Sequence, residues 1–134
     1  MRKKNKAPEK KVEMEILGWL RAANFACWKV DRQGTYDPIR KVFRKNHNPY
    51  KIKGISDIQG FIFDRGLFVE VKSETGVLSP EQRKFLAMVN NNGQIGFVAR
   101  SLLGFLEELA KHFPDKPDFQ EMLKQYIGDR RKEH

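Results

Sequence analysis

The residues most suited to chemistry stand in one short stretch, residues 54–72. Asp57 precedes an apolar run, and Glu70 and Lys72 occupy alternate positions near the end of the next apolar run. Alternate residues of a strand share a face, so Glu70 and Lys72 are predicted to point the same way. Charged groups among residues suited to burial weaken a fold unless they are paired or bind a metal. We therefore interpret Asp57, Glu70 and Lys72 as a candidate site.

Two carboxylates and a lysine have a specific chemical use. Carboxylate oxygens are ligands for Mg²⁺, and for Mn²⁺ as a substitute. Such a metal acidifies a bound water and reverses the repulsion between the carboxylates and a phosphate group. The lysine can orient that water or offset developing negative charge. The set indicates hydrolysis of a phosphodiester, and the alternative is a Glu70–Lys72 ion pair on a solvated face.

The elements that must position these residues are two strands and a tight turn. Strands are predicted over residues 56–63 and 67–73, which are rich in Ile, Phe and Val. Asp64-Arg65-Gly66 is the predicted turn between them, with Gly66 able to take a positive φ. In such a hairpin the carboxylates of Asp57 and Glu70 lie side by side.

A helix and a further strand follow the hairpin. Ser79-Pro80-Glu81-Gln82 combines a capping serine, a proline in the first turn and a glutamine at the capping-box position. Gln82 therefore has two possible roles, as the capping residue or as a polar group of the site. Asn92-Gly93 ends this helix, and residues 95–99 form a short apolar strand.

The N-terminal part of the chain predicts a helix that points acidic residues inward. Residues 9–24 have the apolar spacing of one helical stripe, and residues 25–31 read as a strand. Glu9 and Glu13 fall on the stripe that faces the sheet, whereas Glu15 lies well off it.

The C-terminal part predicts two more helices. One begins at Ser101 and continues to about His112, and Asp118-Phe-Gln-Glu121 is a second capping box for a short final helix. Residues 129–134 are expected to fray. The predicted fold class is therefore α/β (α+β), with a mixed central β-sheet flanked by helices.

The charge of the chain is concentrated in two segments. The 134 residues carry a net charge of +9, of which residues 1–11 hold +5 and residues 29–53 hold +6, while residues 54–113 hold −1. A basic segment with interleaved aromatic residues is typical of nucleic-acid binding, and the alternative is a solubilising tail with a lysine-rich loop. The candidate DNA-binding residues are Lys29, Arg32, Arg40, Lys41, Arg44, Lys45, Lys51 and Lys53.

Several classes of protein are disfavoured. No apolar run reaches the length of about 20 residues that spans a bilayer, and no secretory signal follows the basic start. The single cysteine, Cys27, fits a reducing cytoplasm. No histidine supports a serine hydrolase, and no Walker A loop or dinucleotide fingerprint predicts a nucleotide cofactor.

The ordered motifs resemble the PD-(D/E)XK nuclease superfamily, and within it the VRR-NUC branch. Asp57 and Glu70-Val71-Lys72 stand at its D…ExK positions, after Gly54-Ile-Ser. Leu78-Ser-Pro-Glu-Gln82 and Gly96-Phe-Val-Ala-Arg-Ser101 follow in the same order. The resemblance covers roughly residues 9–110, and Ser56 replaces the proline of the superfamily's name.

The resemblance implies a restriction-endonuclease-like core of order α-β-β-β-α-β-α. It implies that Asp57, Glu70 and the carbonyl of Val71 bind the metal and that Lys72 is the catalytic lysine. It also implies a glutamate on the first helix, for which Glu9 is narrowly preferred to Glu13.

The expected function is that of a Mg²⁺- or Mn²⁺-dependent DNA endonuclease acting on branched DNA such as Holliday junctions. We expect a homodimer in the cytoplasm of a bacterial or phage-infected cell, without a membrane partner. The alternatives are a restriction-type or tRNA-type nuclease of the same superfamily and a catalytically silent DNA-binding module. The predicted domains are a flexible basic arm over 1–8, the nuclease domain over 9–113 and a C-terminal helix and tail over 114–134.

Overall fold

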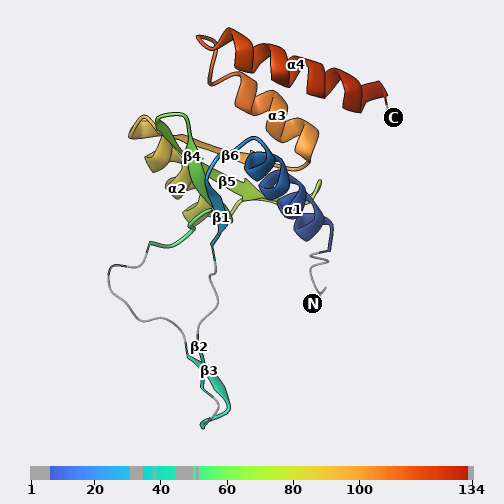
Figure 1. Ribbon diagram of the computed structural model, residues 1–134. Helices are drawn as coiled ribbons and strands as arrows, with labels where there is room; N and C mark the ends of the chain where they lie inside the picture. The colour runs from blue at the N-terminus through green and yellow to red at the C-terminus, as the bar shows by residue number, and fades with distance from the viewer. Residues whose placement is uncertain (1–6, 31–34, 38, 45–49, 51, 133–134) are drawn as a thin grey trace.

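A mixed β-sheet between two layers of helices forms the body of the protein (Figure 1). The computed structural model describes residues 7–30, 35–37, 39–44, 50 and 52–132. Its elements are α1 (Ala7–Ala22), β1 (Cys27–Lys29), β2 (Thr35–Asp37), β3 (Val42–Arg44), β4 (Ile58–Ile62), β5 (Arg65–Val71), α2 (Pro80–Asn91), β6 (Ile95–Ala99), α3 (Leu102–Ala110) and α4 (Pro117–Lys132).

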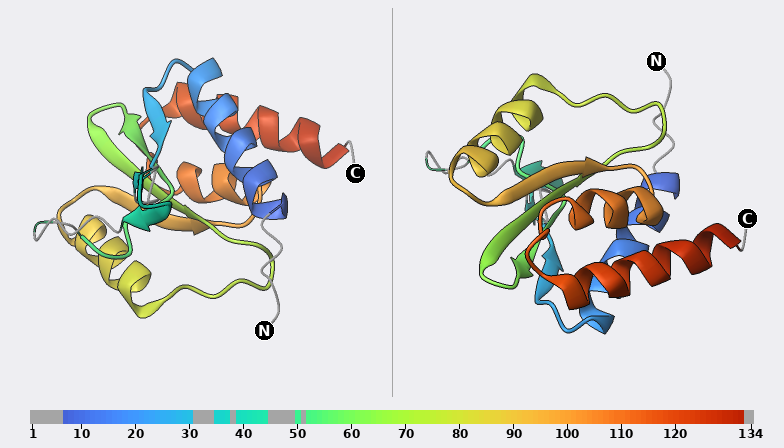
Figure 2. Two further views of the ribbon diagram at one scale, coloured as in Figure 1. Left: turned by 90° about the horizontal axis from the view of Figure 1, so that it is seen from below. Right: turned by 90° about the horizontal axis from the view of Figure 1, so that it is seen from above.

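The four-stranded sheet has the order β1-β4-β5-β6. β4 pairs antiparallel with β1 and β5, and β6 pairs parallel with β5 after the crossover through α2. Figure 2 shows α1, α3 and α4 on one face of the sheet and α2 on the other. This arrangement confirms the predicted α/β class and the mixed sheet. Compared with the order α-β-β-β-α-β-α that the resemblance implies, the structure also has a β2–β3 hairpin after β1 and the final helix α4, which the sequence predicted.

The two faces of the sheet bury different numbers of side chains. The larger core lies under α1, α3 and α4, and β5 contributes Leu67, Val69 and Val71 to it. The smaller core lies under α2 and includes Phe68, which packs partly buried against Phe85. Because Glu70 alternates with Val69 and Val71, it lies on the α2 face with Phe68.

α1 begins at Ala7, two residues earlier than the sequence predicts, and ends at Ala22. Pro8 is therefore inside its first turn, where a missing N–H is tolerated. Glu13 is buried together with Ile16 and Leu20, which confirms that this stripe of the helix faces the sheet.

The predicted turn at Asp64-Arg65-Gly66 is wrong by one to two residues. Ile62 pairs with Arg65, so the loop consists of Phe63 and Asp64, and Gly66 lies within β5. Phe63 has a φ of 56°, a conformation that favours glycine. Ring contacts of 5.1–5.3 Å between centroids outweigh this local preference, and the partners are Phe25, Phe113 and Phe119.

The last helix also differs from its prediction. α4 begins at Pro117, so Asp118 lies inside the first turn and does not cap the helix. α4 continues to Lys132, so residues 129–132 are helical where fraying was expected. Tertiary contacts stabilise it, namely the burial of Phe119 and Leu123 and the Arg130–Glu15 ion pair at 3.5 Å.

The segment between β1 and β4 contains a short hairpin. Thr35 pairs with Arg44, and Asp37 with Val42, in an antiparallel two-stranded sheet. Figure 1 shows this hairpin apart from the four-stranded sheet. Across the described ranges, no helix combines the length and the apolar character needed to cross a membrane.

Candidate active site

Asp57 and Glu70 face each other at one end of the β4–β5 hairpin. Ile58 pairs with Val69, so the next position of the ladder sets Asp57 opposite Glu70, with both side chains on the α2 face. Asp57 Oδ2 accepts a hydrogen bond of 2.9 Å from the backbone N–H of Val71. The Glu70 residue is only 2% exposed. The hairpin therefore brings the two predicted carboxylates to one place.

Gln82 performs the capping role and contacts the site at the same time. Its backbone N–H donates to Ser79 Oγ at 3.1 Å, and its Oε1 accepts from the Ser79 N–H at 2.9 Å, which completes the predicted capping box. Its Nε2 then donates to Glu70 Oε1 at 3.0 Å. One amide thus caps the start of α2 and contacts a buried carboxylate.

Gly54 holds the segment before Asp57 against α2. It adopts a φ of 77°, and a Cβ at this position would lie 2.3 Å from the backbone carbon of Glu81. Any side chain here would push the first turn of α2 away. The glycine therefore allows Asp57 and Gln82 to approach the same end of β5.

The two glutamates of α1 have different partners. Glu9 is half-buried, and its Oε1 accepts from the backbone N–H of Ser73 at 3.2 Å, just after Lys72. Glu13 is 8% exposed, and its Oε1 lies 3.2 Å from Lys29 Nζ on β1. The structure thus brings Glu9, rather than Glu13, to the end of β5.

Lys72 lies immediately after β5 and is 6% exposed. Its backbone N–H donates to the Ala99 carbonyl at 3.1 Å. Gly76 packs against its aliphatic stem, since a Cβ there would lie 3.4 Å from Lys72 Cδ. Arg100 Nη1 donates to the carbonyls of Ser73 at 2.5 Å and Gly76 at 2.7 Å. These hydrogen bonds hold the loop that follows Lys72 against the end of β6.

Arg100 belongs to the motif Gly96–Ser101, but the sequence alone assigned it no role. Its position directly after β6, which is parallel to β5, was the available signal, because parallel neighbours end at the same edge of a sheet. In sum, side chains from four places in the chain contact residues 70–73, namely Glu9, Asp57, Gln82 and Arg100.

The donor atoms at this end suit a hard divalent cation. Within the part of the chain that the structure describes, no three His, Cys, Asp or Glu side chains gather as a metal site. The predicted ligands need only two carboxylates, Asp57 and Glu70, with the Val71 carbonyl as a third oxygen. Because Mg²⁺ commonly binds through one or two carboxylates and keeps several waters, this donor set fits it.

The structure describes the side chains of four of the eight predicted DNA-binding cations. Lys29 is turned to the α1 face by its ion pair with Glu13. Lys53 is exposed beside Gly54, close in sequence to Asp57, and Arg40 and Lys41 are exposed at the turn of the β2–β3 hairpin. Outside the described residues, or with an undescribed side chain, lie Arg32, Arg44, Lys45 and Lys51.

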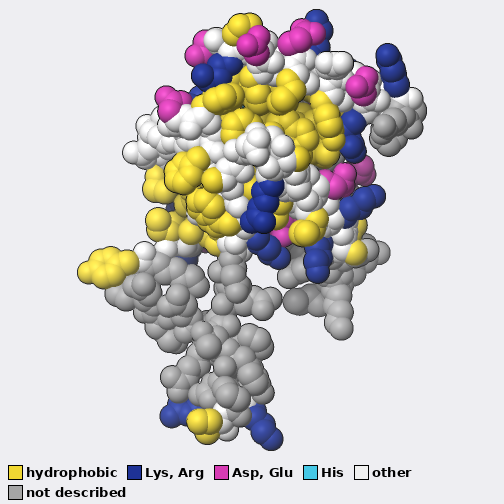
Figure 3. All heavy atoms as spheres, viewed as in Figure 1, with side chains coloured by type: hydrophobic (Ala, Val, Ile, Leu, Met, Phe, Trp, Pro, Cys, Tyr) yellow, Lys and Arg dark blue, Asp and Glu magenta, His cyan; other side chains and the backbone are white. Residues whose placement is uncertain are grey.

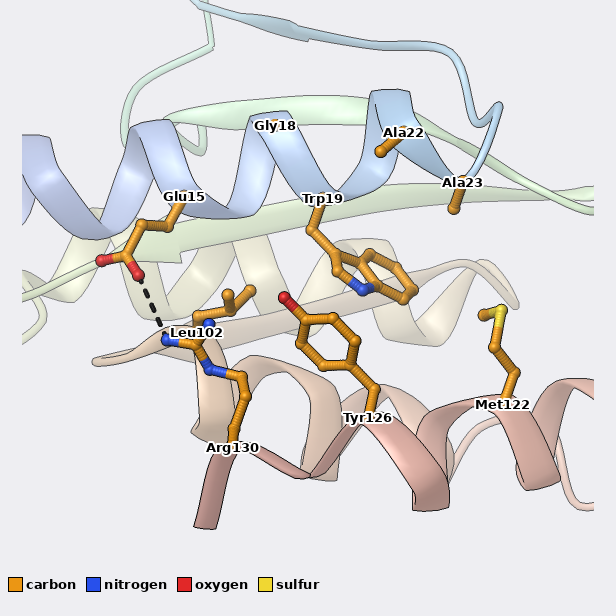
Figure 4. A pocket seen from close by; sticks show the side chains of 9 residues that line it. All are labelled: Glu15, Gly18, Trp19, Ala22, Ala23, Leu102, Met122, Tyr126 and Arg130. Carbon is orange, nitrogen blue, oxygen red and sulfur yellow. Dashed lines mark ion pairs between the residues drawn. The ribbon is translucent and has the colours of Figure 1, made fainter. Parts of the chain in front are cut away.

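A cavity of about 500 Å³ lies elsewhere, between α1 and α4 (Figure 4). Trp19, Met122 and Tyr126 line it, and the Glu15–Arg130 ion pair lies at one end. Figure 3 shows apolar side chains gathered over these helices. The cavity contains none of the predicted site residues, so it is separate from the acidic end of the sheet.

Comparison with known proteins agrees with the motifs. The model of the VRR-NUC domain family matches residues 6–102. A solved structure described as a VRR_NUC domain protein is similar at 16% identity, with 84% of this chain and 90% of that chain covered and a TM-score of 0.49. No curated protein matches the chain. Since the family match spans well over half of the sequence, the chain belongs to the VRR-NUC domain family and is a nuclease-type domain.

Proposed function

We propose that this protein is a Mg²⁺- or Mn²⁺-dependent DNA endonuclease that hydrolyses phosphodiester bonds. The observation that carries the proposal is the gathering of polar side chains around residues 70–73. Glu70 and Lys72 are almost fully buried there, and Asp57 and Glu9 each accept a hydrogen bond from a backbone N–H of this segment.

This arrangement is unfavourable for stability and therefore calls for another explanation. Removing a carboxylate or an ammonium group from water costs several kcal/mol, and buried ion pairs seldom repay that cost. Glu70 nonetheless lies in β5 and Lys72 directly after it, among apolar neighbours. In a site that binds a cation and a phosphate group, the carboxylate of Glu70 and the ammonium group of Lys72 would each have a binding partner.

Each residue has a proposed role. Asp57, Glu70 and the Val71 carbonyl would hold the metal ion, which supplies Lewis acidity and lowers the pKa of a coordinated water. Lys72 would place a positive charge beside the scissile phosphate, and Glu9 would act as the acidic group from α1. Gln82 would keep Glu70 in its rotamer through the 3.0 Å hydrogen bond.

The substrate and the assembly form part of the same proposal. The basic segment 29–53 and the N-terminal residues would bind phosphates, and the products would carry 3′-hydroxyl and 5′-phosphate ends. A domain of 134 residues surrounds little DNA, so a homodimer with two sites would act on two strands of a branched junction. We propose a cytoplasmic location for this activity.

A substrate panel tests the proposal. Four-way junctions, flaps and linear duplex are each incubated with the protein in Mg²⁺, Mn²⁺ or EDTA. We expect metal-dependent cleavage that favours branched DNA, and a loss of roughly 10²–10³-fold in Glu70→Gln and in Lys72→Ala. Matched controls are Glu121→Gln and Lys124→Ala, which change exposed residues of α4.

Two outcomes would contradict the proposal, and a third would reject only its branched substrate. Cleavage that survives in both site variants would remove the assigned residues from the reaction. Salt-sensitive DNA binding without cleavage under any metal would instead identify a silent binding module. Cleavage confined to linear duplex would retain the nuclease and reject the branched substrate.

A further inference from the structure

The sheet face that carries Glu70 continues beyond the helix that covers it. α2 packs on β5 and β6. Across the ladder, Gln59 of β4 pairs with Phe68 of β5, and Trp28 of β1 pairs with Gln59. Directly opposed residues of antiparallel strands share a face, and so do alternate residues of one strand. Trp28, Gln59 and Phe61 therefore extend the α2 face toward the edge of the sheet.

Two large aromatic side chains are left open to solvent on this extension. Trp28 is 40% exposed and Phe61 is 58% exposed. Their rings lie 5.8 Å apart between centroids at an interplanar angle of 61°. An adjoining pair of exposed aromatic rings on a regular sheet is a surface that commonly has a partner.

Beneath the two rings, the backbones of β1 and β4 approach each other closely. The N–H of Phe61 donates to the Ala26 carbonyl at 2.9 Å. A Cβ at Gly60 would lie 2.4 Å from that same carbonyl oxygen. The glycine therefore lets β1 approach β4 closely, and this pairing holds Trp28 and Phe61 as diagonal neighbours.

The aromatic pair is in line with the acidic end of the sheet. Asp57, Gln59 and Phe61 are alternate residues on one face of the chain through β4. At a rise of about 3.3 Å per residue, Phe61 lies about 13 Å along the strand direction from Asp57. That distance corresponds to roughly four stacked nucleotides. A DNA strand that followed β4 from a phosphate at Asp57 and Glu70 would reach the rings.

We propose that Trp28 and Phe61 form a stacking platform for unpaired bases of the DNA strand that is cleaved, which rests on the proposed nuclease function. Every base offers a flat π-face to an aromatic ring, but a base inside a duplex already has its faces covered. The platform thus favours single-stranded segments, strand ends and the open bases of a junction.

The charge of the chain favours a nucleic acid as the occupant. Residues 29–53, with a net charge of +6, leave the sheet directly after Trp28 and return just before β4, the strand of Phe61. Interleaved cations and aromatic rings are the composition that binds single strands. A protein partner would not require a neighbouring segment with a net charge of +6.

Equilibrium binding without metal tests the platform independently of cleavage. In EDTA, fluorescently labelled single-stranded DNA and blunt duplex are titrated with the wild-type protein, Trp28→Ala and Phe61→Ala. We expect each variant to lose about tenfold in affinity for the single strand and little for the duplex. Phe61→Tyr should retain the affinity, and Met122→Ala, which changes an exposed apolar residue of α4, is the matched control.

The readouts separate this inference from the proposed function. Thermal unfolding of each variant shows whether it folds, and intrinsic fluorescence in a Trp19→Phe background reports on Trp28 directly. Quenching of Trp28 by single-stranded DNA supports the platform even if no cleavage is found. Unchanged single-strand affinity in both folded alanine variants, or an equal loss for duplex, would overturn it.

Discussion

The two ends of the β4–β5 hairpin differ in the side chains that they bury: aromatic rings pack at the turn, and charged groups lie at the other end. At the turn, the ring of Phe63 packs among three other phenylalanines although its φ of 56° is unfavourable. At the other end, Asp57, Glu70 and Lys72 place polar groups where the neighbouring side chains are apolar. Packing explains the aromatic end, because the ring contacts stabilise the fold. It does not explain the polar end, whose buried charges require a function.

The sharpest prediction at the polar end concerns the two glutamates of α1. Glu9→Gln should reduce metal-dependent cleavage by roughly a hundredfold, because Glu9 reaches the residue after Lys72. Glu13→Gln should cost far less activity and mainly affect stability through its lost ion pair with Lys29. Initial cleavage rates and urea unfolding of both variants measure the difference. The reverse order of activities would place Glu13 in the site.

At the aromatic end, ring packing and backbone strain can be separated by two variants of Phe63. Phe63→Ala should lower the free energy of unfolding by about 2 kcal/mol, since the ring is 44% exposed and only part of its packing is lost. Phe63→Gly should lower it by about 1 kcal/mol less than alanine does, because glycine accepts the positive φ.

Chemical denaturation in urea provides both values for Phe63, and cleavage should be unaffected because the turn lies at the far end of the hairpin from Asp57. A glycine variant less stable than the alanine variant would show that the positive φ carries no strain.

A smaller effect is expected at Ser56, next to Asp57. Its side chain is fully buried, and within the described residues its Oγ has no hydrogen-bond partner. Ser56→Ala should therefore raise the free energy of unfolding by about 1 kcal/mol, because an unsatisfied hydroxyl is removed from the interior. A melting temperature below that of the wild type would indicate a partner for this hydroxyl.

The smallest effect is a pH dependence near the aromatic end. Burial lowers the pKa of His112 below its ordinary value of 6.5, Arg65 and Lys111 lower it further, and Glu108 opposes them. As the pH falls below 6.5, the unfolded chain takes up the proton first, so stability should decrease until the native pKa is passed and then level off.

Unfolding of the wild type and of His112→Gln at a pH of about 7.5 and about 5.5 tests this link. The variant should lose less stability on acidification than the wild type does. An equal loss in both would assign the pH dependence to other groups.

Local signals in the sequence predicted much of the fold. The capping box of Ser79 and Gln82, the strand over residues 95–99 and the inward stripe of α1 each depend on residues close together in the chain, and the structure has all three. The turn at Phe63 was missed because its conformation depends on rings about 40 to 55 residues away in the chain. The length of α4 was missed for the same reason.

The candidate site was predictable in residue types but not in contacts. The spacing of Glu70 and Lys72 and the hairpin topology placed the acids together. Two of these contacts join elements that are adjacent only in the folded protein. They are the hydrogen bond from Gln82 to Glu70 and the hydrogen bond from Arg100 to the Ser73 carbonyl. Strand alternation alone could predict the face on which Trp28 and Phe61 each lie. Only the register between β1 and β4 shows that the two rings are in contact.

The contrast between the two ends is tested most directly by Lys72→Met, which removes a buried charge and leaves an unbranched side chain one atom shorter. Cleavage of a four-way junction in Mg²⁺ and the free energy of unfolding are measured on the same preparation. We expect cleavage to fall roughly 10²–10³-fold in a variant that still folds. Unchanged cleavage together with reduced stability would contradict it, because Lys72 would then serve the fold and not the reaction.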